Sequence, residues 1–481
     1  MISQDLMAPI MFGGLIVFLL IGYPAAFSLG AVGLFFSFIG IEMGMFQPTF
    51  LQALPDRVFG ILSNDLLLSI PFFTFMGAIL EKCGLAEDML EGLGQLFGPI
   101  RGGLAYAVII VGAILGAITG TVAASVIAMG LISLPIMLRY GYNPRVATGV
   151  IAASGTITQL IPPSLVLIVL ADQLGKSVGD MYAGAIGPSI IQIVLFCLFI
   201  FFLSIFRPQD VPALPPEARP KIDWKLFKKI LWGIVPSIAL IFLVLGTILM
   251  GLATPTEGGA MGSVGALVLA AMNKRLQKTL VWDAMTSTMR INAMVIFILI
   301  GSTVFGLAFR GVDGDLWIEH LLSGLPGGQV GFLIVVNLFV FFLAFFLDYF
   351  EIAFIIIPLL APVAQKLGID LIWFGVLLGA NMQTSFMHPP FGFALFYLRG
   401  VAPKSVKSSD IYYGALPWVG LQLILVAIII FVPETVTYFI DKPAIAVDAN
   451  AISVDPLEGV QQNEITVDSS SEIERQLREN K

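Results

Sequence analysis

The sequence is poor in charged residues. Asp, Glu, Lys and Arg make up only 12% of its 481 residues, about half of what soluble domains carry. Hydrophobic residues reach 58%, and the mean hydropathy is +0.95. This composition excludes a soluble globular enzyme, a nucleic-acid-binding protein and a disordered chain. Because long uncharged apolar runs recur along nearly the whole length, the sequence predicts an all-α polytopic protein of the lipid bilayer rather than an outer-membrane barrel.

Cysteine and histidine are also scarce, with two of each. Cys83 and Cys197 form no CxxC pair and no plausible metal set, so we interpret them as small packing residues. The chain has no GxxxxGK[ST] motif, which excludes ATP hydrolysis within it. A membrane subunit of an energy-converting enzyme would need cofactor ligands or a series of charges within the membrane, and the sequence has few of either. We therefore predict no cofactor and no enzymatic activity, and a transport function would have to be driven by a gradient or a partner.

The few charges are unevenly distributed. The proline-rich segment 207–229 contains six basic residues, and a second basic loop holds Lys274, Arg275 and Lys278. By the positive-inside rule both lie in the cytoplasm, which predicts a bacterial inner-membrane protein with a periplasmic N-terminus. The tail 441–481 carries −5 of the net charge of −7. We expect this tail to be a flexible cytoplasmic extension.

The basic linker 207–229 divides two halves, 1–206 and 230–440, that resemble each other. Several residues align at an offset of 227, and no gap is needed between 135 and 163. The aligned pairs are Pro99 and Pro326, Pro135 and Pro362, Gly141 and Gly368, Ala153 and Ala380, and Pro162-Pro163 and Pro389-Pro390. Internal repeats are typical of secondary transporters, whose substrate and ion sites lie where the repeats meet.

Residues 102–138 form an uncharged stretch whose middle reads Thr119-Gly120-Thr121. The arm on each side of this centre is too short to cross the hydrocarbon core. We therefore predict a helical hairpin that enters the membrane and turns back at this tip. Threonine hydroxyls and freed carbonyls there are suitable oxygen ligands for Na⁺. A tight turn without an ion is the alternative.

A second hairpin is predicted over 327–365, in the other half. Its tip carries Asp348 and Glu351 between two apolar arms, and Asp348 aligns with Thr121 at the same offset. A carboxylate within the membrane is costly and therefore a functional candidate. The alternative is that this tip reaches the membrane surface, where the acids are hydrated.

Two further spans, 146–171 and 371–398, carry a proline pair near the middle. Proline removes a backbone donor and disfavours helical angles in the preceding residue, so each pair predicts a broken helix with free carbonyls. The residues at these breaks include Ser154, Gly155, Thr156, Pro162 and Pro163 in the first span, and Asn381, Gln383, Thr384, Ser385, His388, Pro389 and Pro390 in the second. Such groups can bind ions or a polar substrate. A simple kink is the alternative, and a neutral hydrogen-bonding role is expected for His388.

With these features together, the sequence resembles the large permease subunit of tripartite ATP-independent periplasmic (TRAP) transporters, the DctM-like proteins. The resemblance covers nearly all of 1–440 and is carried by five stretches in order: 70–90, 116–164, 253–269, 345–362 and 388–403. It implies an elevator-type fold, in which scaffold helices hold still while a transport domain of two hairpins and two broken helices moves. It also implies Na⁺-coupled uptake of an organic acid, with a periplasmic DctP-like binding protein and a small DctQ-like membrane subunit as partners.

The resemblance also implies two sodium sites at hairpin tips and helix breaks. Carried onto this sequence, the first comprises Thr119, Gly120, Thr121, Ser154, Gly155 and Thr156, and the second comprises Asp348, Asn381, Gln383, Thr384 and Ser385. Two positions depart from the usual family pattern. The first tip has Thr-Gly-Thr instead of Ser-Gly-Ser, and His388 replaces a threonine before the second proline pair. A standalone Na⁺/anion symporter without a binding protein is the alternative function.

Overall fold

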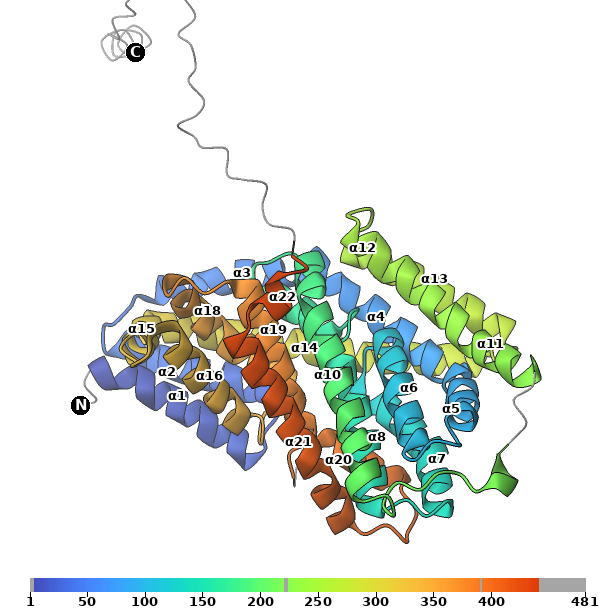
Figure 1. The fold of residues 1–481 in the computed structure, drawn as a ribbon. Coiled ribbons are helices and arrows are strands. Elements are labelled where there is room, and N and C mark those ends of the chain that lie inside the picture. The colour runs from blue at the N-terminus through green and yellow to red at the C-terminus, as the bar shows by residue number, and fades with distance from the viewer. Residues whose placement is uncertain (1–3, 220–223, 390–391, 441–481) are drawn as a thin grey trace, which may run out of the picture. The chain divides into compact units, whose positions relative to one another are not determined.

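The computed structural model describes residues 4–219, 224–389 and 392–440, and these form helices and loops without a β-strand (Figure 1). Residues 4–219 contain α1 (Gln4–Ile21), α2 (Ala25–Glu42), η1 (Pro48–Ala53), α3 (Leu54–Leu62), α4 (Asp65–Glu81), α5 (Leu85–Leu96), α6 (Gly103–Thr119), α7 (Val122–Arg139), α8 (Pro144–Thr156), η2 (Ile157–Gln159), α9 (Leu165–Leu174), α10 (Val178–Phe206) and, in the linker, η3 (Pro216–Ala218). Residues 224–440 contain α11 (Trp224–Ile241), η4 (Phe242–Gly246), α12 (Thr247–Leu249), α13 (Pro255–Met272), α14 (Lys278–Gly311), α15 (Gly314–Ser323), α16 (Gly328–Leu343), α17 (Tyr349–Glu351), η5 (Ile352–Ile356), α18 (Ile357–Lys366), α19 (Leu371–Met382), η6 (Gln383–Phe386), α20 (Phe393–Val401), α21 (Ser408–Phe431) and α22 (Glu434–Thr437). The segments η4 and η5 are π-helical and the other η segments are 3₁₀-helical.

Many of these helices are long and apolar enough to cross a membrane. In the described part of the chain, seven segments qualify: Ala25–Glu42, Val122–Arg139, Val178–Phe206, Leu226–Leu249, Lys278–Gly311, Tyr349–Lys366 and Ser408–Phe431. Two bent pairs also qualify, α3 with α4 and α15 with α16, which turn by 46° and 118°. The all-α polytopic fold expected from composition is therefore confirmed.

Glycines allow several of these helices to pack closely. A Cβ atom built on Gly301 of α14 would lie 2.4 Å from the carbonyl oxygen of Ala26 in α2. The same atom on Gly149 of α8 would lie 2.2 Å from the carbonyl oxygen of Gly414 in α21. Lipid provides no hydrophobic drive for helix association, so such close backbone approach supplies the packing energy.

Both predicted hairpins are present, and they open toward opposite ends of the molecule. At the base of the α6–α7 hairpin, Gly102 and Asn143 donate backbone hydrogen bonds to Val211 and Asp210, just after the end of α10. The α16–α18 hairpin leads into α19, whose Ile372 packs against Gly184 near the start of α10. The 29-residue α10 is about 43 Å long, so the two bases lie far apart.

The offset of 227 residues relates structural features of the two halves as well as their amino-acid sequences. Gly141 and Gly368 both adopt positive φ angles, of 82° and 72°, directly before a broken helix. Two residues later, Asn143 and Asp370 both cap that helix with their side chains. The two halves therefore form inverted repeats with hairpins and broken helices in equivalent places. The boundaries 1–206, 207–229 and 230–440 remain predictions.

The end of the described chain lies at the opposite end of α10 from the basic linker. Cβ atoms built on Gly184 and Gly187, near the start of α10, would contact Ile440 and Thr435, and Figure 1 shows α22 beside that end of α10. The linker 207–229 follows the other end of α10. If the linker is cytoplasmic, residue 440 therefore lies on the periplasmic side, so the predictions of a cytoplasmic linker and of a cytoplasmic tail are in conflict on this geometry. The tail 441–481 itself lies outside the described residues.

Candidate functional site

The first broken helix has a wide gap between its two parts. The α-helix α8 ends at Thr156, a single 3₁₀ turn follows, and α9 begins only at Leu165. The Ser164 hydroxyl accepts a hydrogen bond from the Val166 N–H and donates one to the Gln159 carbonyl. This cap holds the end of the break and the start of α9 together. The helix is therefore broken, and the simple kink is excluded.

The first hairpin packs directly on this break. The turn at Gly120 has a φ of +61°, and a Cβ there would lie 3.9 Å from the Pro163 carbonyl oxygen. Along α6, Cβ atoms built on Gly112 and Gly116 would come within 2.7 Å of the Ser154 Cβ and 2.9 Å of the Thr158 Cα. The predicted tip and the predicted break are thus neighbours, as a shared ion site requires.

The tip of the second hairpin is a reciprocal cap. The Glu351 N–H donates to the Asp348 carboxylate over 2.8 Å, and the Asp348 N–H donates to the Glu351 carboxylate over 3.0 Å. Neither acid forms an ion pair within the described ranges. Like Asp348, Thr121 is the residue before the returning arm of its hairpin, although its side chain makes no cap. Asp348 therefore has a structural role that sequence reasoning did not anticipate.

The second break is held against the second hairpin by an amide and by aromatic rings. The Asn381 amide donates to the Asn337 backbone carbonyl oxygen in α16 over 2.8 Å. The His388 ring stacks on Phe345, with centroids 4.1 Å apart, and meets the Phe341 ring edge-on at 4.4 Å. The second tip and break are therefore also brought together, mainly through α16 and the loop after it.

Two glutamines from long helices join the breaks of opposite halves. The Gln422 amide of α21 donates to the Thr156 hydroxyl over 3.0 Å and approaches the Met387 sulfur at 3.8 Å. The Gln192 amide of α10 donates to the Gln383 side-chain oxygen over 2.6 Å. Each break therefore contacts the long helix of the other half. Sequence analysis missed both glutamines, although a lone Gln in an apolar span was an available signal.

Several buried polar atoms near the breaks have no hydrogen-bond partner within the described residues. They are Ser154 Oγ, Gln159 Oε1, Gln192 Oε1, Asn381 Oδ1, Gln383 Nε2, Gln422 Oε1 and both ring nitrogens of His388. An unpaired buried polar atom costs about 1–3 kcal/mol, so native proteins seldom keep several without a use. Five of these atoms are neutral oxygens, which are ligands that Na⁺ accepts. Each break therefore has neutral oxygen atoms that are available to a small hard cation.

The remaining predicted site residues are less available to bind an ion. Thr156 donates to the Ala153 carbonyl and accepts from Gln422, so its hydroxyl is already engaged. The Thr384 and Ser385 hydroxyls donate to carbonyls within their own helix. Gly155 faces the first hairpin through Val126. Pro390 and the side chain of Thr119 lie outside the described part of the chain.

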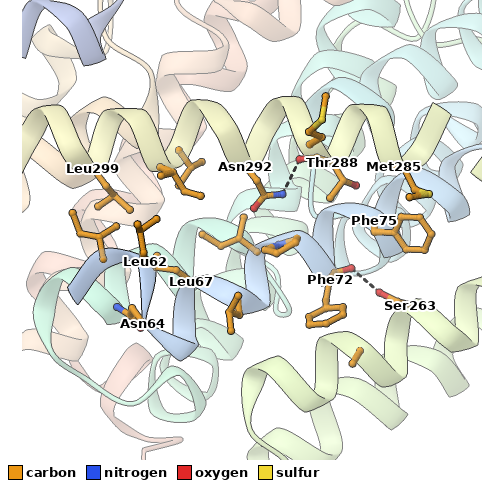
Figure 2. A pocket seen from close by; sticks show the side chains of 18 of the residues that line it. Leu62, Asn64, Leu67, Phe72, Phe75, Ser263, Met285, Thr288, Asn292 and Leu299 are labelled. Carbon is orange, nitrogen blue, oxygen red and sulfur yellow. Dashed lines mark hydrogen bonds between the residues drawn. The ribbon is translucent and has the colours of Figure 1, made fainter. Parts of the chain in front are cut away.

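Two larger cavities lie away from the breaks. One, of about 570 Å³, is enclosed by α4, α13 and α14 and is mainly apolar, with Asn64, Ser263, Thr288 and Asn292 as its polar side chains (Figure 2). It holds no charged group that could balance a carboxylate. The other, of about 490 Å³, lies between α3, α14 and α15 on one side and α9 and α18 on the other, and it is lined by arginines and acids.

Comparison with known proteins identifies the fold and the family. The family model of the tripartite ATP-independent periplasmic transporter, DctM component, matches residues 12–435. The chain belongs to the DctM family. It is thus a multi-pass TRAP-transporter large permease and not an enzyme, which confirms the resemblance seen in the sequence.

The sequence matches to relatives in the DctM family extend over nearly the whole chain. The C4-dicarboxylate TRAP transporter large permease protein DctM of Rhodobacter capsulatus is 29% identical over 89% of this chain and 97% of its own length. The isethionate TRAP transporter permease protein DctMQ of Oleidesulfovibrio alaskensis is 26% identical over 90% of this chain and 66% of its own. The crystal structure of the Alcanivorax borkumensis YdaH transporter has a similar fold, with a TM-score of 0.56 at 15% identity over 79% of this chain and 86% of that one.

Proposed function

We propose that this permease performs Na⁺-coupled uptake of a small organic anion across the bacterial inner membrane. The observation that carries the proposal is the pair of hairpin-and-break sites, each with buried oxygen atoms that lack a partner in the described residues. Coupling to an ion also fits a chain without an ATP-binding motif. Na⁺ is transported cargo in this scheme, and it would bind near Gly120 and Ser154 in one half and near Asp348 and Asn381 in the other.

The substrate class follows from the relatives and from charge balance. The two relatives described above are named for a C4-dicarboxylate and for isethionate, which is a sulfonate. Both are small anions. Bound Na⁺ offsets the charge of such a cargo, and the positive ends of the helix dipoles at the N-termini of α9 and α20, which follow the breaks, favour anions. A small carboxylate or sulfonate is therefore the proposed substrate.

The proposed motion is of the elevator type. The hairpins and broken helices carry the cargo as one body, and the remaining helices, among them α2, α4, α13 and α14, form the scaffold. A small DctQ-like subunit would bind the scaffold, and a periplasmic DctP-like protein would deliver the substrate. The proposed orientation in the membrane places the basic loops 207–229 and 274–278 on the cytoplasmic side. The N-terminus and residue 440 then lie on the periplasmic side.

The test is uptake into proteoliposomes that contain the permease and its small subunit. Labelled succinate and isethionate serve as probes, with an inward Na⁺ gradient or an equal K⁺ gradient, and with or without the binding protein. We expect uptake only when Na⁺ and the binding protein are both present. Uptake with Na⁺ alone would instead identify a standalone symporter. Uptake driven equally by K⁺ would overturn sodium coupling, and failure of both anions under every condition would overturn the substrate class.

A further inference from the structure

We propose that the cavity between α3, α14, α15, α9 and α18 is a separate receiving site for the anion, with Arg57 and Arg310 as its binding groups. The cavity measures about 490 Å³, enough for a small organic acid with its water. Arg57 comes from α3 and Arg310 from the end of α14, so two elements distant in sequence present guanidinium groups to one space. The inference rests on the proposed function for its substrate class.

The two arginines of this cavity have no hydrogen-bonding partner in the described residues. Neither forms an ion pair or a side-chain hydrogen bond with any residue that the structure describes. A guanidinium group has five N–H donors in a planar fork that matches carboxylate and sulfonate oxygens. Two such forks without partners on one cavity wall are suited to a small anion with one or two acidic groups.

The cavity also contains three acids, Asp172, Asp315 and Glu319. Asp172 accepts hydrogen bonds from the amides of Asn64, at 2.7 Å, and Gln173, at 2.9 Å. Glu319 is paired with Lys366. The Asp315 carboxylate accepts from the Leu316 N–H at 3.0 Å, forms no ion pair in the described ranges, and lies close enough to Arg310 for the two charges to interact. Glu319 is thus neutralised by a lysine, and Asp172 and Asp315 keep their charges, whereas the N–H groups of both guanidinium groups remain without a hydrogen-bond acceptor among the described residues.

The cavity lies on the face opposite the basic loops. It is lined by Gln173, at the end of α9, and by Arg310, at the end of α14. Helix α9 leads into the start of α10, and the start of α14 follows the basic loop 274–278. If these loops are cytoplasmic, the cavity opens on the periplasmic side, where substrate arrives.

The two walls of the cavity belong to different parts of the proposed elevator. Arg57 and Arg310 belong to the scaffold wall, whereas Pro358 and Pro362 of α18 belong to the second hairpin. Phe354, which also lines the cavity, follows the tip residue Asp348 by six positions, or about 9 Å along a helix, and Pro358 follows it by ten, or about 15 Å. An anion held by the arginines therefore lies beside the moving wall but is distinct from the predicted sodium site at the tip.

The test is arginine footprinting of the full-length permease with its small subunit in nanodiscs, in K⁺ salts without Na⁺, gradient or binding protein. Phenylglyoxal labelling rates are read by mass spectrometry at Arg57 and Arg310, with Arg101 and Arg139 beside the first hairpin's base as internal controls. Succinate and isethionate are the probes. An occupied site slows labelling by 1 + [L]/Kd, or about elevenfold at a concentration ten times Kd. We expect this protection at Arg57 and Arg310 only.

Variants separate this site from the predicted tip site. Arg310→Gln removes one charge-assisted contact and should raise the Kd measured at Arg57 about tenfold. At the same anion concentration the protection of Arg57 then falls from about elevenfold to about twofold. Lys176→Gln, a charge removal outside the cavity, should leave the protection unchanged. Asp348→Asn should leave the protection unchanged, even if it abolishes Na⁺-driven uptake. Labelling rates unaffected by either anion, or protection that requires Na⁺ and is lost in Asp348→Asn, would overturn the receiving site. Failure of Na⁺-driven uptake with protection intact would count against the proposed coupling alone.

Discussion

Asp348 is both a helix cap and a predicted sodium ligand. The effect of its charge can therefore be tested apart from its capping role. The carboxylate caps the returning arm of the second hairpin by accepting the Glu351 N–H at 2.8 Å. Asparagine is as good a helix cap as aspartate, whereas alanine costs about 1 kcal/mol at such a position. We therefore expect Asp348→Asn to unfold thermally like the wild type, and Asp348→Ala to lose about 1 kcal/mol of stability.

The charge contributes more than the cap if Asp348 helps to bind Na⁺. Two unit charges 4 Å apart interact by about 4 kcal/mol at an effective dielectric of 20, and even a quarter of that changes affinity about fivefold. We expect Asp348→Asn to raise the Na⁺ concentration for half-maximal uptake by at least about fivefold. Uptake by proteoliposomes at varied Na⁺ and constant ionic strength measures this value.

Glu351→Gln is the matched control, because glutamine preserves the reciprocal cap and removes the same charge three residues away. It should shift the half-maximal Na⁺ concentration less than Asp348→Asn does. If Asp348→Asn keeps the wild-type Na⁺ curve and only Asp348→Ala is impaired, Asp348 is a capping residue and not part of a sodium site.

Three further changes probe the packing around the breaks. Gly149→Ala should destabilise the permease by about 1–3 kcal/mol, because the new Cβ would lie 2.2 Å from a carbonyl oxygen of α21. Gly420→Ala, whose Cβ would have nothing within 4 Å, should leave the stability unchanged. Equal melting temperatures for the two variants would contradict this prediction. Gln422→Leu removes the hydrogen bond to Thr156 and should weaken Na⁺ dependence in uptake assays, whereas an unchanged Na⁺ curve would make this contact purely structural. His388→Thr should lose about 1 kcal/mol of aromatic packing in thermal unfolding and keep Na⁺-dependent uptake. Loss of that dependence would instead give the ring a role in transport.

The hairpins and breaks could be predicted because their signals are local. An uncharged run with Thr-Gly-Thr in its centre placed the first turn where the structure has it, between Thr119 and Val122. The proline pair 162–163 likewise placed the first break within the observed gap between α8 and α9. In each case a few neighbouring residues determine the backbone, since proline lacks an N–H and glycine adopts positive φ readily.

The contacts between the halves could not be predicted in the same way. Gln422 and Thr156 are 266 residues apart, and a single hydrogen bond leaves no periodic signal in either helix. The capping role of Asp348 was also hidden, because a carboxylate in an apolar run indicates both a cap and an ion ligand. The side of the membrane on which residue 440 lies stays a prediction, since the composition of a tail does not say where the preceding helix ends. The sodium sites themselves remain predictions.

The crossed glutamine contacts have a consequence for biosynthesis. Thr156 leaves the ribosome 266 residues before Gln422, which is its partner in α21. During that interval the Thr156 hydroxyl can already donate to the Ala153 carbonyl of its own half, but the amide from which it later accepts a hydrogen bond has not yet been made. The hydrogen bond between the first break and α21 therefore forms only after the last long helix has been inserted. A chain truncated before α21 would keep the broken helix of the first half and lack this contact between the halves.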